Sequence, residues 1–142
     1  MLTKFQKFYR ETSEAWTERV LYPEAAPHIM LQAWLQRIAR KQVEREYALG
    51  TGRADILVRY PYPPKKKQAE QRFVLELKEV LDGRSLDSTI RAGLKQTAKY
   101  ADKCNPYEAH LIVVDPRKRS WDEKVYVKEL SFEGRAITVW GM

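Results

Sequence analysis

The chain has 142 residues, of which 44% are hydrophobic and 32% charged, a balance typical of one soluble globular domain with its own core. It carries 26 Lys and Arg against 19 Asp and Glu, and the resulting charge of +7 favours a polyanionic partner such as nucleic acid. No apolar run approaches the roughly 20 residues of a membrane span, and no signal peptide opens the chain, so we expect no membrane partner.

The single cysteine, Cys104, excludes an intramolecular disulfide and fits a reducing, cytoplasmic location. Together with His28 and His110 it cannot supply the four ligands of a structural zinc site. We expect Cys104 to be a small core residue on a helix, and both histidines to be structural.

Two helices are expected at the start of the chain. Apolar residues spaced by threes, fours and one seven predict an amphipathic helix over residues 2–20. The stretch 22–27 breaks it, and a second helix follows with Pro27 in its first turn. We assign residues 1–22 to an N-terminal helix or linker and residues 23–142 to the main domain.

Strands dominate the next part. Alternating patterns predict strands over residues 42–49, 53–60 and 72–80. The stretch 61–71 is rich in proline and charge, so it is expected to be the loop that joins the second and third of these strands.

The remaining chain is predicted to add one helix and three strands. A helix is expected within residues 82–103, with Ser85 as its N-cap. The continuous apolar run at 109–115 is typical of a strand covered on both faces. Residues 124–130 and 135–140 are expected to form a terminal pair of strands.

The third predicted strand, "RFVLELKEV", carries charges on both faces. Strand alternation places Glu76 and Lys78 on one face, flanked there by Val74 and Val80, while Glu79 takes the opposite face. One interpretation is a solvated sheet face. The other is a metal site.

Asp55, in "GRADILV", lies early in an otherwise apolar strand, where a carboxylate is costly to bury unless it is paired or bound to a cation. A hairpin between the second and third strands would bring it to Glu76 if the register allows. Two carboxylates suit Mg²⁺, and the ammonium of Lys78 could orient a water or stabilise charge on a phosphate.

The predicted order helix–strand–strand–strand–helix–strand, with Asp55, "LELK" and "QTAKY", resembles the PD-(D/E)XK nuclease superfamily. The resemblance covers roughly residues 24–115. It implies an α/β (α+β) fold with a restriction-endonuclease-like αβββαβ core, in which helices flank a central mixed sheet.

More closely, the chain resembles the C-terminal nuclease-like domain of bacterial AAA-like ATPases, in runs such as "LQAWLQRIAR", "EREYALGTGRADILV" and "GLKQTAKYADKC". It has no Gly-rich phosphate-binding loop of its own. An ATPase would therefore be a further domain or a partner, with residues 1–20 as the helix that links to it.

The superfamily resemblance also implies roles for individual residues. Asp55 and Glu76 would ligate one or two Mg²⁺ or Mn²⁺ ions, with the Leu77 carbonyl as a further ligand, and Lys78 would position or activate the attacking water. Gln96 and Tyr100, which match the Gln-x-x-x-Tyr signature of several branches, would hydrogen-bond a phosphate or a water. The alternative for this last pair is helix packing for the tyrosine and a surface position for the glutamine.

Many members carry a further Glu on the helix before the first strand. Glu24 is the candidate here, and Glu44 or Glu46 could fill the role instead. The alternative is that Glu24 is simply an acidic residue at a helix N-terminus, where it is favourable.

Basic residues recur every four positions on the predicted helix after the third strand, at Arg91, Lys95, Lys99 and Lys103. The first three, with Arg53, are candidate nucleic-acid contacts. A solvated helix face is the alternative.

These features favour a Mg²⁺- or Mn²⁺-dependent phosphodiesterase acting on nucleic acid, DNA rather than RNA. One alternative is a non-catalytic nucleic-acid-binding or regulatory module of a larger ATPase. Another is an oligomerisation domain, for example of a homodimer, whose polar strand face is wet.

Overall fold

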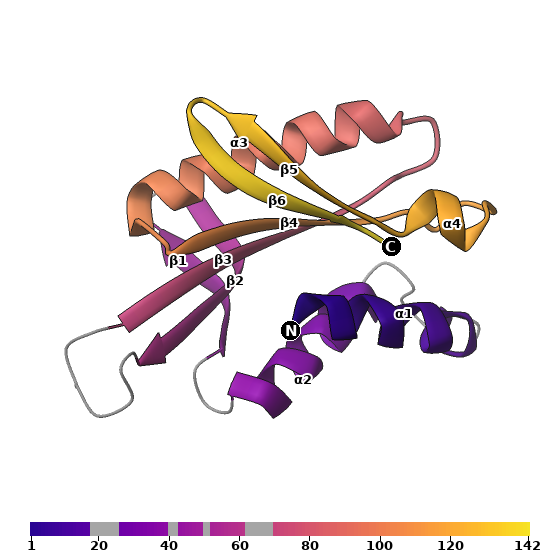
Figure 1. Cartoon of the computed structure of the whole chain (residues 1–142), viewed down its shortest axis with the longest axis horizontal. Coiled ribbons are helices and arrows are strands. Elements are labelled where there is room, and N and C mark those ends of the chain that lie inside the picture. The colour runs from indigo at the N-terminus through magenta and orange to yellow at the C-terminus, as the bar shows by residue number, and fades with distance from the viewer. Residues whose placement is uncertain (18–25, 40–42, 50–51, 62–69) are drawn as a thin grey trace.

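A six-stranded mixed sheet with helices on both faces organises the molecule (Figure 1). The computed structural model describes residues 1–17, 26–39, 43–49, 52–61 and 70–142, and at 14–17, 38–39, 43–49, 52–55, 60–61 and 70 it describes the backbone without side chains. The elements are α1 (Leu2–Thr17), α2 (Ala26–Ala39), β1 (Val43–Leu49), β2 (Gly52–Pro61), β3 (Glu70–Glu79), α3 (Leu86–Cys104), β4 (Glu108–Val114), α4 (Trp121–Lys124), β5 (Tyr126–Phe132) and β6 (Arg135–Gly141).

The strand order across the sheet is β1-β2-β3-β4-β6-β5. The β3–β4 and β4–β6 pairs are parallel, and the other three pairs are antiparallel. A parallel pair needs a crossover connection, which α3 supplies between β3 and β4. The run α2-β1-β2-β3-α3-β4 has the expected αβββαβ order, so the predicted fold class is confirmed.

Each face of the sheet has its own hydrophobic core. Figure 1 shows α1 and α2 on one side of the sheet and α3 on the other. Leu75 and Leu77 of β3 pack in the cluster that contains α1 and α2 residues, whereas Val74 and Val80 pack with residues of α3. Strand alternation therefore works as predicted for β3. In β4 every residue after Glu108 is buried, which explains its continuous apolar run.

Helix α3 is tightly placed over the sheet. The Ser85 hydroxyl accepts a hydrogen bond from the Ser88 amide at 3.1 Å, which confirms the predicted N-cap. At Gly93 the helix comes so close to β4 that an added Cβ would lie 2.5 Å from Leu111 Cδ1. This close approach positions the turns that follow Gly93 against the sheet.

The short helix α4 was not predicted. Its four residues are too few to show a helical period. The available signal was the capping-box spacing of Ser120 and Glu123, in which the Ser120 amide donates to the Glu123 carboxylate at 3.2 Å. Within the described ranges, no helix combines the length and apolarity needed to cross a membrane.

Helix α1 shares a core with the strands. Phe5 and Tyr9 are buried in the same cluster as β3 and β4 residues. The Gln6 side chain, also buried, donates to the backbone carbonyls of Tyr126 at 3.0 Å and Gly141 at 2.6 Å. These two hydrogen bonds connect α1 to β5 and β6. The domain boundary after residue 22 stays a prediction.

Replacing Gln6 by alanine is expected to lower the free energy of unfolding by about 1–3 kcal/mol, because two carbonyl oxygens in a buried place lose their donor. Urea unfolding followed by circular dichroism measures the change. Lys7→Ala is the control, since the exposed neighbouring residue should change stability by less than about 0.5 kcal/mol. Equal stability of the two variants would show that this contact does not anchor α1.

Candidate active site

The centre of the candidate site is an ion pair within β3. Glu76 is 0% exposed, and its Oε1 atom lies 2.8 Å from Nζ of Lys78. Both residues lie on the face of β3 that carries Val74 and Val80, which α3 covers. A buried carboxylate is costly unless a cation or hydrogen bonds compensate it. The interpretation of this face as merely solvated is therefore wrong for Glu76.

The two partners differ in their access to solvent. The Lys78 side chain is 29% exposed, whereas Glu76 is fully enclosed. The ammonium thus lies at the boundary between the buried carboxylate and the outside. A ligand could reach Lys78 without the sheet having to open.

The predicted Gln-x-x-x-Tyr motif lies on α3. Gln96 Nε2 donates to the Tyr100 hydroxyl at 2.9 Å. Tyr100 is buried and packs in one cluster with Leu57 and Val74. Val74 precedes Glu76 by two positions on the same strand face, so Tyr100 packs against the position next to Glu76 on that face.

Asp55 lies in β2, and its side chain is outside the described residues. The antiparallel register of β2 and β3 pairs Ile56 with Leu75. Asp55 and Glu76 are the positions immediately beyond this pair, in β2 and β3 respectively. The predicted pairing of the two strands is confirmed as antiparallel, and residues 62–69 of the predicted loop lie outside the described residues.

The Leu77 side chain is buried on the opposite face of β3, in the cluster shared with α1 and α2. Its carbonyl remains a predicted metal ligand. Within the part of the chain whose side chains are described, no three His, Cys, Asp or Glu residues are grouped to hold a metal ion. A complete ligand set would need the carboxylate at position 55.

Several other candidates cannot be placed by their side chains. Glu24 lies outside the described residues, and so do the side chains of Glu44, Glu46 and Arg53, although these three belong to β1 and β2. Their roles stay predictions.

The basic residues of α3 are all exposed: Arg91, Lys95, Lys99 and Lys103. Their side chains therefore lie on the solvent side of the helix, which suits either a nucleic-acid contact or a solvated surface.

The cysteine and one histidine are structural, as predicted. Cys104 is buried beside Tyr100, and burial raises the pKa of its thiol, which keeps it neutral. His110 is also buried, and it contacts the Glu108 carboxylate at 3.1 Å and the Trp140 indole N–H at 3.3 Å. Burial lowers the pKa of His110 more than Glu108 raises it.

The sequence model of the PD-(D/E)XK nuclease superfamily matches residues 23–120, well over half of the chain. The matched range contains the whole αβββαβ core and the candidate positions Asp55, Glu76, Lys78, Gln96 and Tyr100. No curated protein and no solved structure matches the chain. The chain belongs to the PD-(D/E)XK nuclease superfamily.

Proposed function

We propose that this protein is a divalent-metal-dependent phosphodiesterase that hydrolyses nucleic acid, with DNA as the favoured substrate. The observation that carries the proposal is the buried Glu76 carboxylate, 2.8 Å from the partly exposed Lys78 ammonium, on the central strand of a nuclease-superfamily core. The net charge of +7 supports a polyanionic substrate.

The donor set fits Mg²⁺ or Mn²⁺. Glu76 would hold the ion together with Asp55, whose position is the next one along from the Ile56–Leu75 pair, and with the Leu77 carbonyl. Hard divalent cations prefer such oxygen ligands, and a cation would compensate the buried charge of Glu76. When bound, the ion supplies positive charge at the scissile phosphate and makes water a stronger nucleophile.

Lys78 would act on the water or on the phosphate. An ammonium has three N–H donors, so one can stay on Glu76 while another binds a water or a phosphate oxygen. Its partial exposure gives these ligands access. A positive charge at this place stabilises the charge that develops on the phosphate in the transition state.

Gln96 and Tyr100 would position the substrate. The hydrogen bond from Gln96 to Tyr100 uses one amide N–H and one lone pair of the hydroxyl. The second amide N–H and the tyrosine O–H are thus left as donors for a phosphate or a water. Burial of the Tyr100 ring against Leu57 and Val74 limits how far these donors can move.

The exposed cations of α3 would steer the polymer. Arg91, Lys95 and Lys99, with Arg53 of β2, would neutralise backbone phosphates without reading sequence. Such contacts weaken as salt rises.

Incubation of the protein with single- and double-stranded DNA and RNA tests the function directly. We expect cleavage with Mg²⁺ or Mn²⁺ and none with EDTA. Asp55→Ala should lower the rate by about 10²–10³-fold because it removes a metal ligand. It should also remove the heat of Mn²⁺ binding in calorimetric titration.

The control is Asp122→Ala, which removes an exposed carboxylate from α4 and should leave the rate unchanged. If no substrate is cleaved with either metal, the proposal that this chain catalyses cleavage is wrong. Salt-dependent but metal-independent binding would then favour the non-catalytic module of a larger ATPase.

A further inference from the structure

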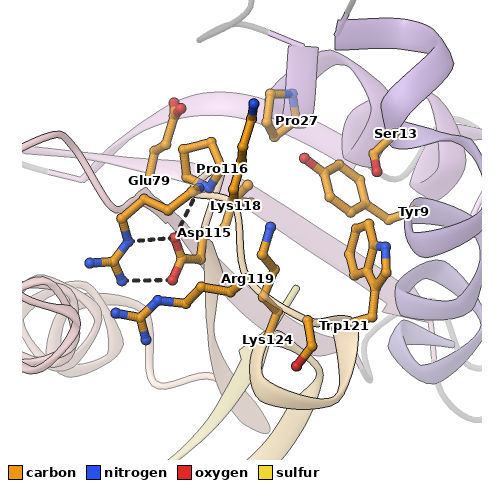
Figure 2. Close-up of a pocket in the computed structure, with 13 residues that line it drawn as sticks. Tyr9, Ser13, Pro27, Glu79, Asp115, Pro116, Lys118, Arg119, Trp121 and Lys124 are labelled. Atoms are coloured by element: carbon orange, nitrogen blue, oxygen red, sulfur yellow. Dashed lines mark hydrogen bonds and ion pairs between the residues drawn. The ribbon is translucent and has the colours of Figure 1, made fainter.

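A cavity of about 630 Å³ lies on the side of the sheet that α1 and α2 cover (Figure 2). Glu76 and Lys78 lie on the opposite face of β3, which α3 covers. Its wall comes from α1, from the start of α2, from the ends of β3 and β4, from the loop 115–120 that follows β4, and from α4. The cavity therefore lies at the edge where the parallel strands β3 and β4 end.

One ion pair shapes the loop at this edge. Asp115 is buried, and its carboxylate accepts hydrogen bonds from the Arg117 guanidinium at 2.7 and 2.6 Å and from the Arg117 amide at 3.1 Å. The guanidinium holds the pKa of Asp115 below its usual range, so the pair stays ionised at neutral pH. These two charges neutralise one another and fix the backbone that carries the next two residues.

The other charges of the cavity are mainly positive. Lys118, Arg119 and Lys124 line it, against the one further carboxylate, Glu79. Among the described residues, no salt bridge joins Lys118 or Arg119 to a carboxylate. The Lys124 ammonium lies 5.2 Å from the centre of the Trp121 ring. The excess of positive charge in the lining therefore favours the binding of an anion in this cavity.

A neutral donor lies among these cations. Figure 2 shows the Tyr9 side chain and Lys118 directed into the same space. Burial, with a smaller contribution from Glu79, raises the pKa of Tyr9 to about 12, so its hydroxyl remains a donor at neutral pH. Donors that come from different elements and directions suit a tetrahedral oxyanion, which has acceptor oxygens on several sides.

We propose that this cavity binds a backbone phosphate of a nucleic-acid strand, at a place separate from the ion pair of Glu76 and Lys78. The choice of nucleic acid over a free phosphate compound rests on the proposed function. Lys78 and Glu79 are consecutive, so the candidate active site and the cavity lie on opposite faces of the same end of β3. A strand that crosses this edge of the sheet would contact both.

The test compares two double variants in binding to a fluorescent oligonucleotide, in EDTA and over a series of salt concentrations. Lys118→Ala/Arg119→Ala removes two cations of the cavity, and Lys4→Ala/Arg10→Ala removes one exposed lysine and one exposed arginine from α1. We expect the cavity variant to bind roughly tenfold more weakly at low salt and the control to bind as the wild type does. The slope of log K against log salt should fall by about 1 in the cavity variant.

Tyr9→Phe adds a variant that keeps the net charge. It should also weaken oligonucleotide binding, because it removes a donor without changing the charge of the protein. Thermal melting of all variants establishes that they are folded.

Equal binding by the cavity variant and the wild type would overturn the proposal, as would equal weakening in the cavity and control variants. Titration with inorganic phosphate distinguishes the two possible occupants, a backbone phosphate of nucleic acid and a free phosphate compound. If phosphate binding depends on Lys118 and Arg119 while oligonucleotide binding does not, the occupant is a free phosphate compound and the proposal is wrong. Because EDTA removes any need for cleavage, failure here is distinct from failure of the proposed function.

Discussion

Lys78→Ala is expected to lower the rate of metal-dependent cleavage by about 10²–10⁴-fold while oligonucleotide binding in EDTA stays close to that of the wild type. The reason is that the ammonium would act on the water or the phosphate in the transition state, whereas affinity for the polymer comes from many exposed cations. Single-turnover cleavage of a labelled substrate measures the first quantity, and fluorescence anisotropy measures the second.

A structural role must be separated from this chemical one. Lys78 lies 2.8 Å from a carboxylate that is 0% exposed, so its removal also lowers the stability of the fold. Lys78→Arg keeps a cation beside Glu76 and should restore stability. It should remain well below the wild-type cleavage rate, because a planar guanidinium places its donors differently.

Lys128→Ala is the matched control, since it removes an exposed lysine from β5 of the same sheet. It should cleave as the wild type does. If Lys78→Ala cleaves at the wild-type rate, or if Lys78→Arg restores that rate in full, the role proposed for the Lys78 ammonium in cleavage is wrong.

Glu76→Gln is expected to abolish both cleavage and the stabilisation of the fold by metal. A ligand present at 100 times its dissociation constant raises the free energy of unfolding by about 2.7 kcal/mol. The wild type should show this gain in Mn²⁺, and the variant should show none. Urea unfolding with and without Mn²⁺ measures the gain without any need for catalysis.

In EDTA the same variant should unfold at nearly the same urea concentration as the wild type, because an amide of equal size replaces a buried charge and its ion pair. Glu129→Gln, at an exposed position of β5, should respond to Mn²⁺ as the wild type does. A Glu76→Gln protein that is still stabilised by Mn²⁺ would show that the metal binds elsewhere.

The local pattern of the chain was sufficient for much of the fold. The apolar run at 109–115 predicted a strand buried on both faces, and β4 is that strand. Ser85 predicted the start of α3, because a side-chain oxygen there satisfies an amide that the helix leaves without a partner. The alternation of β3 placed Glu76 and Lys78 on one face, because successive strand residues point to opposite faces.

Two features of the fold were not predicted from the local pattern of the chain. α4 spans four residues, about one helical turn, and so shows no period. Nor did the pattern show that α1 donates hydrogen bonds to two carbonyls of β5 and β6, since Gln6 is separated from them by at least 120 residues.

By itself, the sequence determined which residues share a strand or helix face, and through the combination of Asp55, "LELK" and "QTAKY" it indicated the superfamily. Only the tertiary structure decided that Glu76 is fully enclosed and held by Lys78, and that Tyr9, Lys118 and Lys124 line one cavity. The physical reason is that periodicity depends on neighbours along the chain, whereas burial and charge depend on which distant segments pack together.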